Sequence, residues 1–269
     1  MANRLTLWGI EGIPEIGAGD DLVALISSAI DAMALSDSDA ALADGDILIV
    51  TSKIISKAEG MQVPLDARDL AIEEDTVRIV AERAHPGGVT KIVETPQGLV
   101  MAAAGLDTSN VPDGMALRLP RDPDASARAL CKALREKTGK RLGLIITDTL
   151  GRPWRVGQTD AAIGAAGVQL VDDLRGGVDA NGRPLNVTVT VLADELAAAA
   201  DLVKGKASRM PVAIARGLAR LVTDLDSPGA KTLARLGEDD MFRFGSTEAY
   251  QQGYDAAMHA LAAKKEKIE

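Results

Sequence analysis

The feature that most constrains the fold is the stretch from residue 142 to residue 160, where a short apolar run ends in polar residues. The apolar run at 142–146 is too short for a helix and therefore predicts a buried strand. It ends in a Thr-Asp-Thr sequence centred on Asp148, and the glycine and Arg-Pro pair that follow favour a turn. The oxygens of a carboxylate and two hydroxyls at a strand end suit Mg²⁺, which commonly bridges to phosphates. Alternatively, Asp148 only caps a turn, and this stretch alone does not decide between the two interpretations.

Composition restricts the kinds of partner. The chain has 269 residues, enough for one large domain or two intimately joined ones, and its 46% hydrophobic and 26% charged residues are typical of a globular protein. Aromatic residues make up only 2%, so the core must be built from Ala, Val, Leu and Ile. This scarcity argues against stacking on nucleic-acid bases, and a net charge of -9 argues against binding a phosphate backbone. We therefore expect no nucleic-acid partner, although this charge is compatible with a local basic pocket for one nucleotide.

Cysteine and histidine offer little chemistry in this chain. Cys131 is the single cysteine, which argues against a disulfide framework or a zinc cluster. His85 and His259 are the only histidines, which argues against a histidine-rich metal site or a catalytic triad. The N-terminal residues lack the apolar core of an export signal, and no apolar run approaches the roughly 20 residues of a membrane span. We expect a cytoplasmic protein with no membrane partner.

Hydrophobic spacing predicts both helices and short strands. Amphipathic patterns predict helices at residues 21–35, 67–83, 122–137, 195–203 and 248–265. Apolar or alternating runs predict strands around 5–10, 47–50, 142–146, 187–191 and 212–215, and a hairpin formed by 91–95 and 99–104. No repeat or flexible linker divides the chain, and residues 224–247 are rich in loops. The predicted class is α+β, with mixed sheets and packed helices.

A second aspartate has the same local pattern as Asp148. Asp107 follows the predicted strand at 99–104 and is surrounded by hydroxyl and amide side chains. If the two strand ends meet, both carboxylates would serve one metal–phosphate site. Their spacing in the sequence does not show that they meet.

Two basic segments could bind phosphate. Ser52, Lys53 and Lys57 follow the strand at 47–50, and a lysine binds phosphate as a point charge. The alternative is a solvated lysine pair at a helix start. The loop at 204–211 also contains lysines and a serine, and its alternative is an ordinary solvated turn.

Five motifs, in this order, resemble those of the coenzyme F-420 gamma-glutamyl ligase family. They are GIPEI at 12–16, DGDILIVTSKIISKAEG at 44–60, AAAGLDTSN at 102–110, TDTLGRPWRVGQTDAAIGAAG at 147–167 and GKASRMPVAIARG at 205–217. The resemblance implies an enzyme that joins L-glutamate to the lactyl carboxylate of the deazaflavin coenzyme precursor, then adds gamma-linked glutamates, while GTP gives GDP and phosphate. It also implies a gamma-glutamyl-ligase-like fold, an intertwined homodimer and two divalent cations, Mg²⁺ or Mn²⁺, with K⁺ stimulating some members.

The resemblance assigns roles to particular residues. It implies metal ligands at Asp107, Asp148 and Thr149, and a GTP contact at Asn110. Further nucleotide contacts are implied at Ile13, Pro14, Glu15, Ile16, Ser52, Lys53, Lys57, Lys204, Gly205, Lys206, Ala207, Ser208, Arg209, Met210 and Pro211. No acidic ligand can be placed in the last loop, which has Lys206 instead, so the coordination of the second metal is in doubt. Candidates for binding the acidic substrates are Arg152, Arg155 and Arg175.

The implied chemistry agrees with these residue types. A carboxylate is a poor acyl donor, so it would first take the γ-phosphoryl group of GTP and then react with the glutamate amine. Phosphoryl transfer needs mainly positioning and charge neutralisation, which metal ions on Asp107 and Asp148, together with Lys57, would supply. We therefore expect these three residues to be catalytic. Neither histidine nor cysteine is needed.

Organisation and function each leave alternatives. We expect residues 1–269 to form one ligase unit, or two interleaved α+β subdomains, with 224–269 as a C-terminal tail and helix. Some relatives carry a further C-terminal flavin-reductase-like domain, which we do not expect here. The alternative functions are another nucleotide- and metal-dependent carboxylate–amine ligase, or a GTP-binding regulatory module.

Overall fold

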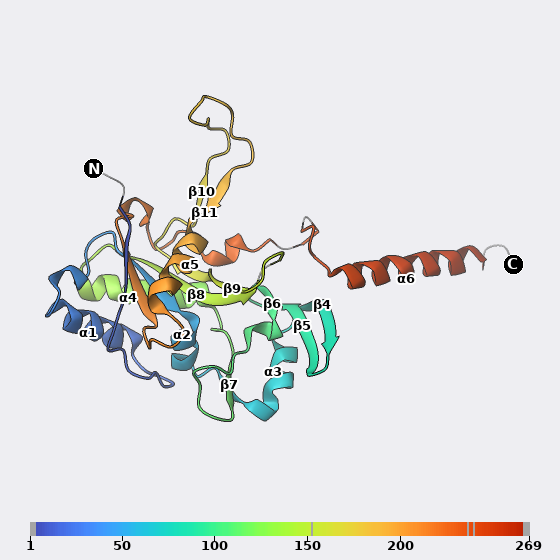
Figure 1. The fold of residues 1–269 in the computed structure, drawn as a ribbon, viewed down its shortest axis with the longest axis horizontal. Helices are drawn as coiled ribbons and strands as arrows, with labels where there is room; N and C mark the ends of the chain where they lie inside the picture. Colours follow the sequence, from blue (N-terminus) through green and yellow to red (C-terminus); the bar gives the residue numbers. More distant parts are fainter. Residues whose placement is uncertain (1–3, 152, 236, 239, 266–269) are drawn as a thin grey trace.

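The computed structural model of the chain describes residues 4–151, 153–235, 237–238 and 240–265. Its centre is a five-stranded sheet with the strand order β1-β12-β2-β8-β9 (Figure 1). These strands are β1 (Thr6–Gly9), β12 (Val212–Arg216), β2 (Ile47–Thr51), β8 (Gly143–Gly151) and β9 (Gln158–Ala166). β2 and β8 are parallel, and the other neighbours are antiparallel. Consequently β1, β2 and β8 end at one edge of the sheet, and β9 and β12 begin there.

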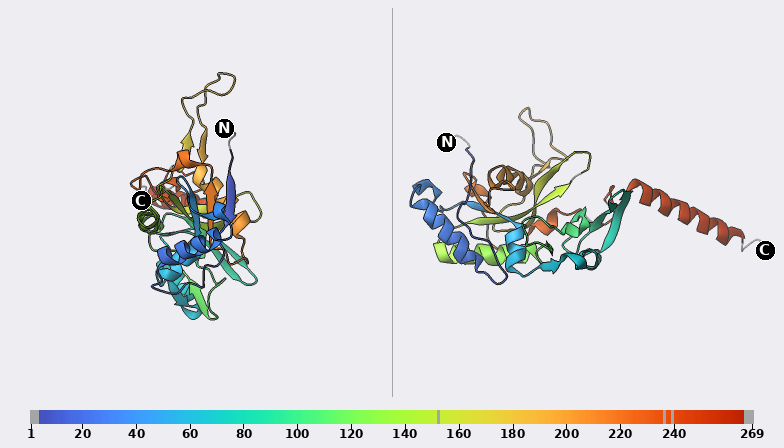
Figure 2. Two further views of the ribbon diagram at one scale, coloured as in Figure 1. Left: turned by 90° about the vertical axis from the view of Figure 1, so that its left-hand side faces the viewer. Right: turned by 60° about the horizontal axis from the view of Figure 1, so that its bottom comes forward.

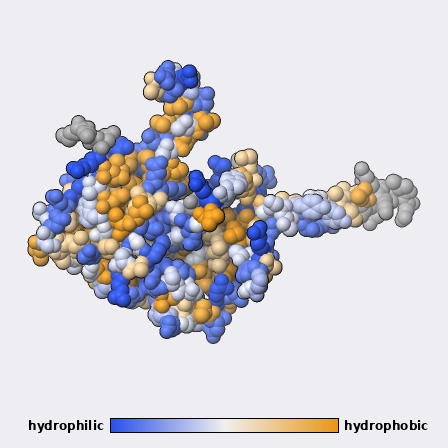
Figure 3. Space-filling model, viewed as in Figure 1, coloured by the Kyte–Doolittle hydropathy of each residue, from blue (hydrophilic) through white to orange (hydrophobic). Residues whose placement is uncertain are grey.

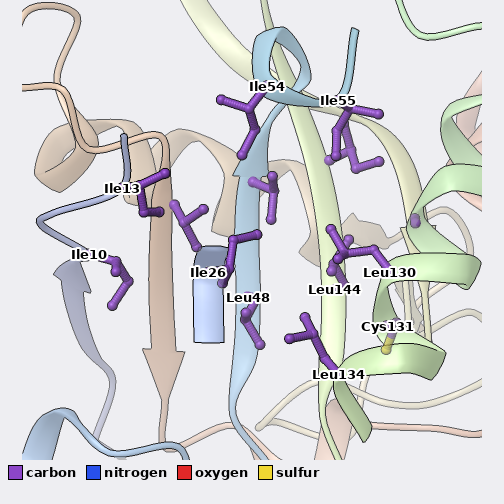
Figure 4. Packing of buried hydrophobic residues seen from close by; sticks show 14 of the residues in the cluster. Ile10, Ile13, Ile26, Leu48, Ile54, Ile55, Leu130, Cys131, Leu134 and Leu144 are labelled. Carbon is purple, nitrogen blue, oxygen red and sulfur yellow. The ribbon is translucent and has the colours of Figure 1, made fainter. Parts of the chain in front are cut away.

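Helices cover both faces of this sheet, because its central strands are apolar on both sides. One face packs against α1 (Leu22–Ala34), α2 (Ser52–Ala58) and α4 (Pro123–Thr138), and the other packs against α5 (Leu192–Lys204). Side chains alternate between the faces along β8. Leu144 and Ile146 join the α1–α4 core, which Figure 4 shows, whereas Ile145 joins the α5 core. Cys131 is buried among these aliphatic side chains (Figure 4).

One close approach fixes α4 against β9. A Cβ atom added at Gly164 would lie 2.4 Å from the carbonyl oxygen of Pro123, the first residue of α4. We expect Gly164→Ala to lower the free energy of unfolding by about 1–3 kcal/mol, because a packed backbone must move to admit the methyl group. Urea denaturation measures this change.

A matched control lies on the neighbouring strand. A Cβ at Gly151 meets no heavy atom within 4 Å, and its φ is outside the left-handed region. Gly151→Ala should leave the free energy of unfolding unchanged or raise it by up to about 1 kcal/mol. Equal losses in the two variants would contradict the close contact between α4 and β9.

Smaller elements surround the sheet. A three-stranded antiparallel sheet has the order β4-β5-β6, and two-stranded sheets are formed by β3 with β7 and by β10 with β11. The strands are β3 (Gln62–Pro64), β4 (Arg78–His85), β5 (Gly88–Glu94), β6 (Val100–Ala102), β7 (Met115–Leu117), β10 (Val171–Asp173) and β11 (Val189–Val191). The remaining α-helices are α3 (Arg68–Glu74) and α6 (Ser246–Lys265). Short 3-10 helices occupy Ser38–Ala40, Leu65–Ala67, Ala103–Gly105, Ala219–Leu221 and Ala230–Leu233.

Two elements project from the body of the molecule. Strands β10 and β11, with the loop between them, form an arm, and α6 extends sideways (Figures 1 and 2). Figure 3 shows apolar side chains on the arm. Val178, Val187 and Val189 of the arm are exposed. Among the described residues, none of the helices, α6 included, has the length and apolar character needed to cross a membrane.

The α+β prediction is confirmed, but three local predictions are wrong. The helix predicted at 67–83 ends at Glu74, and residues 78–85 form β4, whose Ile79 and Ala81 pair with β5 on either side of a bulge at Val80. The strand predicted at 142–146 continues to Gly151, because β9 pairs with it along its whole second half. The strand before Asp107 is also shorter than predicted and ends at Ala102.

Candidate active site

Strand direction collects the predicted site residues at one edge of the central sheet. β1 leads into the loop at 12–16, β2 leads into Ser52, and β8 carries Asp148 near its end. The loop at 204–211 precedes β12 and reaches the same edge, where Thr51 N donates to Pro211 O at 2.9 Å. Motifs far apart in the sequence therefore become neighbours.

Asp148 lies at this edge of the sheet, and its carboxyl group has a raised pKa. The Ser52 hydroxyl donates to Asp148 Oδ1 at 2.8 Å. The pKa of Asp148 is raised to about 6, chiefly by burial. Hydrogen bonds from Ser52 and the backbone N–H of Thr149 oppose this rise in pKa, and the negative charges of Asp160 and Asp107 add to it. Three carboxylates are thus close enough to influence one another, which favours a cation here.

Asp107 reaches the site through an irregular segment rather than directly from a strand. Ala103, Ala104 and Gly105 have φ values of 50, 53 and 75°, a region that costs an L-residue about 1–2 kcal/mol. Asp107 then bonds to the backbone of Leu117, which anchors its position. This strain just before a candidate ligand is typical of functional sites.

Lys53 links Asp107 to the central sheet. Its Nζ lies 2.6 Å from Asp107 Oδ2 and donates to the carbonyl oxygen of Ser109 at 3.2 Å. Burial by itself would raise the pKa of Asp107, but the hydrogen bonds from Lys53 and Ser109 and the charge of Lys53 lower it below its ordinary value. Consecutive residues of α2, Ser52 and Lys53, therefore bind the two candidate carboxylates.

The sequence analysis missed a third carboxylate, Asp160 of β9. It is only 3% exposed and accepts hydrogen bonds from Thr147 Oγ1 at 2.9 Å and from Thr149 Oγ1 at 2.7 Å. Lys204 Nζ lies 3.0 Å from its Oδ2 atom. The available signal was a single aspartate among small apolar residues in QTDAAIGAA, because a charge in such a strand needs a partner.

The alternation along β8 divides the site between two faces. Asp148 points to the α2 side, whereas Thr147 and Thr149 point to the α5 side and bind Asp160. Burial lowers the pKa of Lys204, and the charge of Asp160 opposes that shift. Lys204 is thus a buried partner of Asp160 rather than a solvated lysine.

Residues 11–217 match the sequence profile of the family described as F420-0:Gamma-glutamyl ligase. The chain belongs to this family. The Coenzyme F420:L-glutamate ligase of Methanothermobacter thermautotrophicus is 40% identical over 257 residues, covering 89% of this chain and 99% of that protein. The proteins of the same name from Methanopyrus kandleri and Natronomonas pharaonis are 38% and 37% identical over 254 residues, 87% of this chain and 97% and 93% of theirs. The protein is therefore a ligase.

In this ligase, the predicted nucleotide segments have mixed surroundings. Ile13 and Ile16 are buried in the core, so within 12–16 only Pro14 and Glu15 expose their side chains. Glu15 accepts a hydrogen bond from the buried Lys57. Ile13, Glu15 and Ile16 thus hold the loop in place, while the Pro14 side chain is exposed.

The other predicted contacts lie in loops at or near the edge. Asn110 and Arg209 both have a φ of 57°, a conformation that Asn tolerates well. The Ser208 hydroxyl donates to the carbonyl oxygen of Lys204, which closes the loop on itself. Gly205, Ala207 and Met210 belong to the same loop, and Met210 packs against Gly9.

Of the three arginines proposed for the acidic substrates, the two within the described residues, Arg155 and Arg175, are not held at this edge by any contact. Arg155 is exposed. Arg175 pairs with Asp173 at the base of the arm, with its Nε 2.8 Å from Asp173 Oδ1. Arg152 lies outside the described residues.

The donor set of the ligase fits one divalent cation better than two. In the described part of the chain, no three His, Cys, Asp or Glu side chains are arranged to hold one metal ion. Mg²⁺, however, usually needs only one or two protein carboxylates, because water and substrate phosphates complete its shell. Asp107 and Asp148 could supply these two carboxylates, although Lys53 and Ser109 already bind the oxygens of Asp107. On the opposite face, lysines already occupy the oxygens of Asp160.

Proposed function

We propose that this ligase joins L-glutamate to the lactyl carboxylate of the coenzyme F-420 precursor and then adds gamma-linked glutamates, with GTP giving GDP and phosphate. The relatives that carry the name Coenzyme F420:L-glutamate ligase support the substrate. One observation carries the reaction type: Ser52 and Lys53 bind the carboxylates of Asp148 and Asp107, which come from separate motifs. A carboxylate pair beside lysines suits phosphoryl transfer, where positioning and charge neutralisation dominate.

The proposed reaction has two steps. A carboxylate oxygen of the precursor attacks the γ-phosphorus of GTP, the bond to the β-phosphate oxygen breaks, and GDP leaves. The glutamate amine then attacks the acyl carbon, phosphate leaves, and the amine loses a proton. Mg²⁺ or Mn²⁺, when bound by Asp107 and Asp148, would neutralise phosphate charge.

The chain's own residues would bind and orient the nucleotide. Lys53 and Lys57 would supply positive charge to the phosphates, and the Ser52 hydroxyl, which donates to Asp148 Oδ1, would hold that carboxylate in its orientation. Further contacts are proposed for Asn110, the backbone of residues 12–16 and the loop at 204–211. The alternation on β8 turns Thr149 away from Asp148 and towards Asp160, to which its hydroxyl donates.

We also propose the assembly that the family resemblance implied. The chain would act as one ligase unit with a gamma-glutamyl-ligase-like fold, in an intertwined cytoplasmic homodimer, with K⁺ as a possible activator. The arm and α6 support this assembly, because both project from the body, and α6 exposes Tyr250, Tyr254 and Met258.

The decisive experiment mixes purified protein with the unglutamylated coenzyme, L-glutamate, GTP and Mg²⁺ or Mn²⁺, and follows product mass. The expected result is the addition of one or more glutamyl residues with release of GDP. GDP release that depends on a different carboxylic acid would instead indicate another carboxylate–amine ligase. GTP binding with no substrate-dependent phosphate release would indicate a regulatory module.

A further inference from the structure

Lys206 lies within the cluster around Thr149 and Asp160. Its Nζ lies 3.1 Å from Asp160 Oδ1 and 3.1 Å from Asp201 Oδ1, and it also donates to Thr149 Oγ1. Asp160 is buried, whereas the Lys206 side chain is 62% exposed. The ammonium group therefore sits at the mouth of a buried oxygen cluster, with part of its side chain in solvent.

The oxygens of this cluster are already paired. Asp160 Oδ2 accepts from Thr147 and Lys204, and Oδ1 accepts from Thr149 and Lys206. A divalent cation such as Mg²⁺ needs unoccupied oxygen ligands at about 2.0–2.1 Å in near-octahedral geometry. Here two lysines balance the two carboxylates of Asp160 and Asp201, so this face presents no excess negative charge.

The opposite face of β8 has a different balance of charge. Asp107 and Asp148 are accompanied by Lys53, and the side chain of Lys57 is engaged by Glu15. Lys53 and Ser109 bind the oxygens of Asp107, but the two carboxylates outnumber Lys53 by one, so one negative charge on that face is left for a cation. The two faces of β8 therefore differ in net charge: the Asp107–Asp148 face keeps one excess negative charge, which favours a metal ion, and the Asp160 face is neutralised by its own lysines.

We propose that the Lys206 ammonium takes the position of a second divalent cation, so that this enzyme works with a single one, held by Asp107 and Asp148. Lys206 presents its positive charge beside Thr149 and, being partly exposed, extends it towards the nucleotide phosphates. Lys binds phosphate as a point charge, as this role requires. The inference rests on the proposed function, because it assigns Lys206 to the same nucleotide site.

The test counts bound metal ions rather than activity alone. Mn²⁺ is titrated into the protein and followed by electron paramagnetic resonance, with and without a non-hydrolysable GTP analogue. The wild-type protein should bind one Mn²⁺ per chain. Lys206→Glu should bind two, because it replaces the ammonium with a third carboxylate beside Asp160 and Asp201.

Two further variants keep the result interpretable. Lys206→Gln removes the charge without adding a carboxylate, so it should bind the second Mn²⁺ more weakly than Lys206→Glu and serves if the latter fails to fold. Lys137→Glu makes the same charge reversal at an exposed position in the last turn of α4 and should still bind one ion.

Each contrary outcome has a defined meaning. Two ions on the wild-type protein, or one ion on both Lys206 variants, would overturn the role of Lys206 and leave the proposed reaction intact. If the wild-type protein binds one ion and Lys206→Glu binds two, but the wild-type protein does not join glutamate to the coenzyme precursor, the role of Lys206 is supported and the proposed substrate is overturned. No bound Mn²⁺ even with the GTP analogue would overturn both.

Discussion

Asp148→Asn is expected to lower the rate of ligation by about three orders of magnitude while the protein stays folded. The substitution removes one of the two carboxylates proposed to hold the divalent cation, and such a cation contributes several kcal/mol to the transition state. The amide oxygen can still accept the hydrogen bond from Ser52. Because burial raises the pKa of Asp148 to about 6, a neutral amide should be no less stable in this position.

Two measurements separate the roles of charge and fold at Asp148. Initial rates of glutamyl transfer give the loss of activity, and urea denaturation gives the free energy of unfolding. Asp31→Asn makes the same chemical change on the exposed face of α1 and should alter neither quantity. An Asp148→Asn enzyme with full activity would rule out Asp148 as a metal ligand.

The largest loss of stability is expected from Asp160→Ala. This change leaves the Lys204 ammonium, whose side chain is 4% exposed, buried without its carboxylate. Breaking a buried ion pair by removing one partner typically costs about 3–5 kcal/mol. Urea denaturation should show the midpoint shifting to lower urea by that amount divided by the m-value.

A double variant tests whether the loss of stability comes from leaving the buried Lys204 ammonium unpaired. Asp160→Ala combined with Lys204→Met removes both charges and should recover much of the loss, which gives a large interaction energy in the double-mutant cycle. The control Glu136→Ala breaks the exposed Lys132–Glu136 pair and should cost less than about 1 kcal/mol. Simple additivity of the two buried substitutions would contradict this explanation.

Hydrophobic periodicity predicted most of the helices and strands, but the helix that was predicted over one charge-rich segment is largely wrong. Residues 67–83 carry many charged residues, yet only Arg68–Glu74 is α-helical. Residues 78–85 form the strand β4 because they pair with β5. A half-exposed strand of this kind has a weak signal in sequence, since its stability comes from a partner strand.

The sequence by itself determined the short apolar strands, the main helices, and the aspartates and lysines that follow those strands. Local spacing and turn residues suffice for these features. Only the tertiary structure decided which side chains meet: the direction of β1, β2 and β8 gathers their ends at one edge. Alternation on β8 then sends Asp148 to one face and Thr149 to the other. The pairing of Asp160 with lysines 44 and 46 residues away follows from strand pairing and burial, which no local pattern contains.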